Sequence, residues 1–135
     1  MGLAEKRVLN QFALTVFPGL KQRVDEAAGF DVPLEVRWDT LAKDATYSSS
    51  WLTGWPKIYF QPMIDAFQQI CVDDMGKQAL RTSLKRVVIQ DTRDGYSSWW
   101  ATFEGGTLTL DSMFTNVDAV ADRTRVLRDA IENGL

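Results

Sequence analysis

The chain of 135 residues is 45% hydrophobic and 24% charged, with a formal net charge of −3, no histidine and one cysteine. This composition indicates one soluble globular domain over residues 1–135, and the weakly acidic charge argues against nucleic-acid binding. The missing histidine excludes a Ser-His-Asp triad, a Cys-His pair and a histidine-based zinc site. A single cysteine cannot form an internal disulfide, and no segment is apolar enough to span a membrane, so we expect a cytoplasmic protein.

The first part of the chain predicts a helix followed by a strand. Apolar side chains recur at three- and four-residue spacing along residues 3–28 and form one stripe. Pro18 lacks a backbone N–H, so we expect it to kink or divide this helix, and Gly29 is a natural helix stop. Residues 34–39 alternate between apolar and polar side chains, which is typical of a half-buried strand.

The segment 40–60 shows no periodicity and is predicted to be an irregular loop, because serines, Gly54 and Pro56 interrupt it. It contains five aromatic residues: Tyr47, Trp51, Trp55, Tyr59 and Phe60. Loops often carry binding residues, and tryptophan and tyrosine are frequent at interface hot spots. The segment is therefore the best candidate for a binding surface. The alternative is that its rings fold back as a lid over the core.

A second helix is predicted to begin at Pro62, because proline suits the first helical position and apolar residues then recur at helical spacing as far as Leu84. Gly76 weakens the middle of this helix by about 1 kcal/mol relative to alanine, so we expect a bend or a break near Asp74. Cys71 lies on the apolar stripe, where a thiol is typically an inert core residue.

Residues 86–111 predict three strands. Alternating patterns cover three stretches, at 86–92, 97–104 and 107–111. The dipeptides Asp94-Gly95 and Gly105-Gly106 between them are tight-turn signals, so an antiparallel meander is expected. Trp99 and Trp100, adjacent in the second stretch, would point to opposite faces of the sheet. One of them is then core, and the other marks an interface if no helix covers it.

The last helix is predicted to begin after Asn116, a good N-cap, and to end at Gly134. Its expected buried stripe is Val117, Val120, Thr124, Leu127 and Ile131. Its exposed side carries two expected i,i+4 ion pairs, Arg125–Asp129 and Arg128–Glu132. Together the elements predict an α+β fold in the order α-β-α-β-β-β-α. Helices would pack on one antiparallel sheet of about four strands, with strand 34–39 at its edge.

Three further groups of residues could carry chemistry. Asp73 and Asp74, with Asp91 or Asp111 nearby in the fold, could hold a hard cation, but without the spacing of a calcium loop we favour solvated acids and predict no metal and no cofactor. A basic stripe formed by Lys77, Arg81 and Lys85 could bind a phosphate or an acidic partner. Cations also favour a helix C-terminus for structural reasons, and we prefer this structural interpretation. A carboxylate pair could hydrolyse a glycoside, but spacing singles out none, so we expect no enzyme and name no catalytic residue.

Four stretches in the second half of the chain carry a likeness to a known type of protein. They are AFQQICVDDMGKQAL, SLKRVVIQDT, FEGGTLTLD and NVDAVADRTRVLRDAIENGL. In these stretches the chain resembles small acidic bacterial immunity-type proteins of polymorphic or contact-dependent toxin systems. The resemblance covers a little over half of the chain and includes no catalytic motif. It implies a small cytoplasmic protein that neutralises a toxin domain by tight binding.

We therefore expect a protein-binding module of the immunity or inhibitor type, monomeric or homodimeric. Its excess negative charge lies beyond residue 91, and an acidic surface steers a basic partner. The expected contact residues are Tyr47, Trp51 and Trp55 as aromatic anchors, assisted by Asp118, Asp122 and Glu132. One alternative is a secretion-type chaperone, which would form a homodimer. The other is a small-molecule or carbohydrate-binding domain or a carboxylate-based enzyme, which would have a deep acidic pocket.

Overall fold

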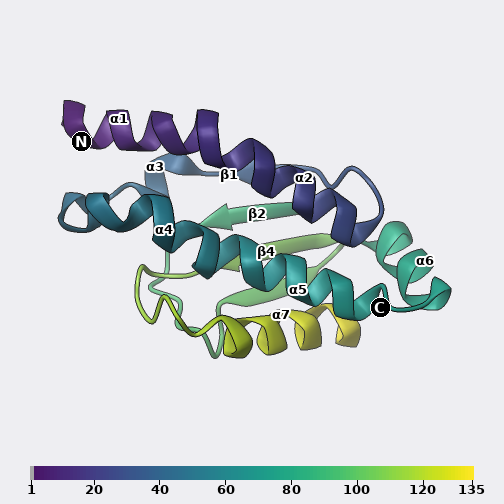
Figure 1. Ribbon diagram of the computed structural model, residues 1–135. Helices are drawn as coiled ribbons and strands as arrows, with labels where there is room; N and C mark the ends of the chain where they lie inside the picture. The colour runs from purple at the N-terminus through teal and green to yellow at the C-terminus, as the bar shows by residue number, and fades with distance from the viewer. Residues whose placement is uncertain (1) are drawn as a thin grey trace.

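The computed structural model describes residues 2–135 and has an α+β fold with one four-stranded sheet, which confirms the predicted fold class (Figure 1). The longer helices are α1 (Leu3–Gln11), α2 (Phe17–Ala28), α5 (Gln61–Ile70), α6 (Asp74–Ser83) and α7 (Val120–Gly134). The strands are β1 (Leu34–Val36), β2 (Arg86–Gln90), β3 (Ala101–Glu104) and β4 (Thr107–Asp111).

The helices and the sheet enclose the hydrophobic core between them. α1, α2, α5 and α7 lie across one face of the sheet (Figure 1). The strand residues that belong to the core alternate along each strand, as Val87 and Ile89 do in β2 and Leu108 and Leu110 do in β4. The residues between them face the other way and include exposed charged and polar side chains: Glu35, Arg86, Thr102 and Glu104.

The N-terminal helix is divided as Pro18 predicts. α1 and α2 are joined by a π-helical turn, η1 (Phe12–Val16), and Pro18 lies in the first turn of α2. Proline has no N–H to donate, and a wider turn just before it accommodates the missing hydrogen bond. The helix axis bends between α1 and α2 (Figure 1). Gly29 then ends α2 in the left-handed conformation, with a φ of +83°.

The strand order is β1-β2-β4-β3, with β1 and β4 parallel to β2 and β3 antiparallel to β4. The sheet is therefore mixed, and the predicted antiparallel meander is wrong at Asp94-Gly95, which closes no hairpin. Segment 91–100 instead passes over the carboxyl end of β4, and β3 pairs on its far side. The hairpin at Gly105-Gly106 between β3 and β4 is confirmed.

The predicted strand at 34–39 does lie at an edge of the sheet, but β1 is shorter, because the chain turns after Val36 into the short helix α3 (Trp38–Leu41). Trp38 packs edge-to-face on Phe12 and Phe17, with ring centroids 5.7 and 5.5 Å apart. Burying this ring against the N-terminal helix is favoured over extending the edge strand.

Segment 40–60 is helical from residue 45 onward, so the predicted loop is wrong. Short 3₁₀, α and π pieces follow one another and run into α5: η2 (Ala45–Ser50), α4 (Trp51–Trp55) and η3 (Pro56–Phe60). Trp51 and Trp55 are each 1% exposed and stack on one another with ring centroids 5.0 Å apart. The second helix thus begins well before Pro62, and its aromatic rings fill the core.

The expected break near Asp74 is present between α5 and α6. Asp73 caps α6 by accepting a hydrogen bond from Gly76 N at 2.8 Å. A Cβ on Gly76 would lie 1.7 Å from Ile70 O, so glycine permits the close approach of α6 to the end of α5. Met75, one of the apolar residues within the predicted second helix, is 82% exposed as a result of this break.

The last helix begins at Val120 instead of directly after Asn116. Asn116 has a φ of +47°, a conformation that asparagine tolerates, and its carbonyl accepts a hydrogen bond from Ala119 N in a turn. Three of the five expected stripe residues are buried: Thr124, Leu127 and Ile131. The two expected ion pairs are wrong, since the observed ones are Arg125–Asp122 at 2.8 Å and Arg128–Asp129 at 3.3 Å.

Within residues 2–135, no helix combines the length and the apolar character that crossing a membrane requires.

Gly95 provides a test of the chain crossing. A Cβ at this position would lie 1.9 Å from Asp111 O, so Gly95→Ala must push the loop away from β4. We expect the free energy of unfolding to fall by about 1–3 kcal/mol, as at other overpacked sites. This loss lowers Tm by roughly 3–10 °C for a domain of this size. Gly19→Ala is the control, because a Cβ there meets nothing within 4 Å. An unchanged Tm for Gly95→Ala would contradict the described crossing.

Candidate functional site

The carboxyl ends of β2 and β4 meet at one end of the molecule because the two strands are parallel neighbours. Three connecting segments converge there, at 42–50, 91–100 and 112–119. Figure 1 shows the arrowheads of β2 and β4 on the same side of the molecule as helix α4. Ligands of open sheets with parallel strands typically bind beyond this edge. The loop end is therefore the expected position of a binding site.

Asp111, the last residue of β4, holds the loop that passes over it. Its Oδ1 accepts hydrogen bonds from Thr92 N at 2.9 Å and Arg93 N at 3.4 Å. Its Oδ2 accepts from Thr92 Oγ1 at 2.6 Å and from Gln90 Nε2 at 3.0 Å. Asp111 is 1% exposed, and both its oxygens are already committed. Its role is to fix the loop, and it offers little to a ligand.

Asp91, which directly follows β2, is 6% exposed and less well satisfied. Its buried Oδ1 lies 3.1 Å from Lys43 Nζ, and this ion pair balances the charge of the carboxylate. Burial raises the pKa of this carboxyl; Lys43 opposes the shift, and Asp111 and Asp94 add to it. A buried carboxylate that costs stability when it is ionised is more often found at functional sites than elsewhere.

A cavity of about 260 Å³ lies at this end, and we call it the acidic aromatic pocket. Its aromatic lining residues are Tyr47, Trp51 and Phe114, and its charged lining residues are Lys43, Asp44, Asp91 and Asp94. Tyr47 stacks on Phe114 with ring centroids 5.5 Å apart and the planes inclined by 27°. Three carboxylates face a single ammonium group, so the pocket carries an excess of negative charge.

Two more aromatic rings are exposed on the loop that contributes Asp94. Tyr96 is 50% and Trp99 44% exposed, and their rings meet edge-to-face with centroids 6.0 Å apart. The Arg93 guanidinium lies 5.4 Å from the Trp99 ring centroid and donates to Trp99 O at 3.0 Å. Trp100 is fully buried and donates from Nε1 to Arg123 O at 3.1 Å. One tryptophan of this pair is therefore core and the other is exposed, but the predicted strand at 97–104 is wrong for both, because β3 begins at Ala101 and the two residues lie in the loop before it.

The structure brings only some of the predicted contact residues to this end. Tyr47 is 45% exposed and forms part of the pocket. Trp51 lines the pocket but is almost fully buried, and Trp55 lies in the core, so neither can be the surface anchor that was expected. The cause is the helical conformation of 45–60, which turns both rings inward.

The three predicted acidic residues are distributed along α7 and the segment before it. Asp118 pairs with Lys57 at 3.1 Å. Asp122 accepts hydrogen bonds from Arg125 and from Ser97 of the loop, which lower the pKa of its carboxyl in that order of importance. Glu132 is exposed near the other end of α7, about 15 Å further along the helix axis. Asp122 therefore belongs to the loop end, and Glu132 does not.

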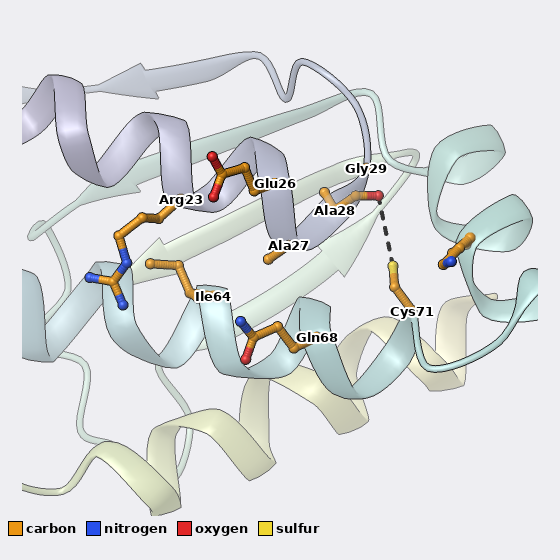
Figure 2. Close-up of a pocket in the computed structure, with 9 residues that line it drawn as sticks. Arg23, Glu26, Ala27, Ala28, Gly29, Ile64, Gln68 and Cys71 are labelled. Carbon is orange, nitrogen blue, oxygen red and sulfur yellow. Dashed lines mark hydrogen bonds between the residues drawn. The ribbon is translucent and has the colours of Figure 1, made fainter.

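A second hollow lies between α2, α5 and α6 (Figure 2). It has a volume of about 570 Å³ and its polar lining residues include Arg23, Glu26, Gln68 and Lys77. Cys71 donates from its thiol to Ala28 O at 3.8 Å (Figure 2), and burial raises the pKa of the thiol, with Lys77 opposing. The charged side chains that line this hollow are exposed and of both signs, which is typical of an ordinary surface groove.

The acids considered for a cation site do not come together. Asp73 and Asp74 lie at the start of α6, which precedes β2, whereas Asp91 and Asp111 lie at the carboxyl ends of β2 and β4. Among residues 2–135, no group of three or more potential ligands has the geometry to hold a metal ion. The basic stripe likewise stays on the surface, where Lys85 donates to Thr82 O at 2.9 Å.

No family model, curated protein or solved structure matches the chain. Function must therefore be inferred from the residues themselves.

The buried Asp91 carboxylate predicts a pH-dependent effect on stability. Because burial raises its pKa, the folded state prefers the neutral acid, and the ionised form destabilises the protein at neutral pH. We expect Asp91→Asn to raise Tm at pH 7. The difference from wild type should shrink as the pH falls through the raised pKa of the folded state and disappear below the ordinary value of 3.8, where the wild-type acid is neutral in both states.

Thermal unfolding from about pH 3 to pH 8, followed by circular dichroism, measures this difference. Asp118→Asn is the matched control, because its side chain is 90% exposed and should leave Tm almost unchanged. A lower Tm for Asp91→Asn at pH 7 would mean that the contact with Lys43 outweighs the desolvation of the carboxylate.

Proposed function

We propose that the protein is a binding module that inhibits a partner protein, in the manner of the immunity-type proteins that its second half resembles. The observation that carries the proposal is the presence of three half-exposed aromatic side chains on segments at one loop end, beside the acidic aromatic pocket: Tyr47, Tyr96 and Trp99. Exposed aromatic rings of this kind are the usual anchors of protein interfaces.

Hydrogen bonds tie the segments of the loop end to the scaffold. Asp111 fixes residues 92 and 93, as described above. Arg123 donates to Asn116 O at 2.7 Å and to Thr115 O at 2.6 Å, and Tyr59 donates to Ser112 O at 2.5 Å. Rigid loops lose little conformational entropy on association, which favours tight binding.

The charges of the pocket indicate the kind of surface that would fit. Asp44 and Asp94 line it, and neither forms an ion pair with a side chain in the described part of the chain. Uncompensated carboxylates beside exposed aromatic rings favour a partner that presents basic residues. The acidic contact surface expected from the sequence is thus centred on the loops instead of on α7.

Substitution of the exposed rings tests the proposal. The tagged protein is used to isolate a partner from its native host, and the purified partner is then used for measurements of Kd and of the partner's own activity. We expect Tyr47→Ala and Trp99→Ala each to raise Kd by about tenfold or more, which is the effect of losing a hot-spot side chain. The wild-type protein should suppress the partner's activity at equimolar concentration.

The control for this experiment is Val72→Ala, a change at an apolar side chain that is 79% exposed in the turn between α5 and α6, away from the loops. Its Kd should equal that of the wild type. A partner whose affinity depends on Val72 and is unaffected at Tyr47 and Trp99 would place the interface elsewhere. A partner that binds without loss of activity would contradict the inhibitor role.

A further inference from the structure

We infer that the acidic aromatic pocket receives a single arginine side chain of the partner protein. This inference rests on the proposed function and specifies it: the exposed rings provide the contact area, and the pocket selects the chemical group at its centre. Four features of the pocket support it, namely its size, its charge, its aromatic lining and the way in which that lining is held.

The size of the pocket suits one long side chain. Its volume is about 260 Å³. Cavities that bury drug-sized ligands typically measure about 300–1,000 Å³. A pocket just below this range has room for one long side chain, and its position beside exposed aromatic rings favours a residue of a protein partner over an oligosaccharide.

The charge of the pocket favours a cation. Asp91 is 94% buried, and its Oδ1 is contacted by Lys43 Nζ at 3.1 Å. Asp94 and Asp44 are further carboxylates in the lining, and Lys43 is the only cationic side chain among the lining residues that the structure describes. An ionised carboxylate oxygen can accept more than one hydrogen bond, so the contact with Lys43 leaves capacity for further donors.

The aromatic lining favours a guanidinium over an ammonium group. A planar guanidinium stacks on aromatic faces and donates hydrogen bonds in its own plane, so it can contact rings and carboxylates at the same time. Tyr47 and Phe114 stack on each other beside Asp44 and Asp94 and provide such faces. Segment 91–100, which contributes Asp94 to the pocket, already contains a guanidinium beside an aromatic ring, because Arg93 lies 5.4 Å from the Trp99 ring centroid.

Gly54 holds the aromatic lining in place. A Cβ at this position in α4 would lie 2.4 Å from Phe114 Cζ, so the ring occupies the space that a side chain would fill. Replacement by alanine must displace the Phe114 ring and disturb its stack with Tyr47. Gly54→Ala therefore alters the pocket without removing any of its polar groups, and alanine is at least as favourable as glycine within a helix.

The probe for the test is N-acetyl-arginine N-methylamide, and its control is the citrulline analogue, which has nearly the same shape but no charge. Each is titrated to about 50 mM into ¹⁵N-labelled protein. We expect saturable shifts of the backbone amides of Tyr47, Trp51, Phe114 and Thr115 with the arginine compound only. These shifts should weaken at high salt, because the attraction is electrostatic.

Three variants test the role of the lining. Asp91→Asn and Asp94→Asn should each raise the Kd of the arginine compound at least threefold, and Gly54→Ala should do the same. Glu132→Gln, at an exposed acid near the other end of α7, should leave the Kd unchanged. Asp91→Asn is informative because it is expected to stabilise the fold, so weaker binding by this variant would not result from unfolding.

Two results would overturn the inference: no saturable shifts at the pocket amides, or equal shifts with the citrulline analogue. Failure here is distinguishable from failure of the proposed function. If the partner's affinity depends on Tyr47 and Trp99 but the arginine compound does not bind, the proposed interface is supported and the arginine pocket is contradicted. If the compound binds in the pocket and no partner is inhibited, the pocket stands and the inhibitor role falls.

Discussion

The passage of the chain over the end of β4 is the constraint on which the loop end depends. Because β2 and β4 are parallel neighbours, the chain must cross β4 before it can form β3. Backbone donors in such a crossing have no strand partner and need other acceptors. The Asp111 carboxylate accepts from Thr92 N and Arg93 N, and the absence of a side chain at Gly95 lets the loop approach Asp111 O. This crossing determines where Asp94, Tyr96 and Trp99 lie.

Arg123 supports the same end of the molecule in an unusual way. Its side chain is fully buried, yet carbonyl oxygens and the Ser112 hydroxyl are its hydrogen-bond acceptors. Burial lowers the pKa of this guanidinium, although arginine stays charged under all physiological conditions. Two buried carboxylates, Asp91 and Asp111, lie at the same end. The loops are therefore held by a few buried charged groups, and such polar networks specify one arrangement more strictly than apolar packing does.

The sequence predicted the fold class, the division at Pro18, the break before α6 and the Gly105-Gly106 hairpin, because each depends on residues close together in the chain. Strand pairing depends on residues that are distant in the chain. The dipeptide Asp94-Gly95 predicts a tight turn but does not determine which strands pair on either side of it. The helical nature of 45–60 was hidden because three short pieces with different periods follow one another. In the candidate site, Tyr47 was identified from its aromatic surroundings. Asp91, Phe114 and Gly54 acquire a role only when the fold brings them together.

The two edges of the sheet have a consequence for how the protein behaves at high concentration. β1 has three residues and β3 has four, and β1 is preceded by Pro33 and followed by the turn into α3. Short edges flanked by proline and charged residues offer few free backbone groups to another chain, which protects against strand-to-strand aggregation. A chain with such edges can reach a high concentration while its molecules stay separate from one another.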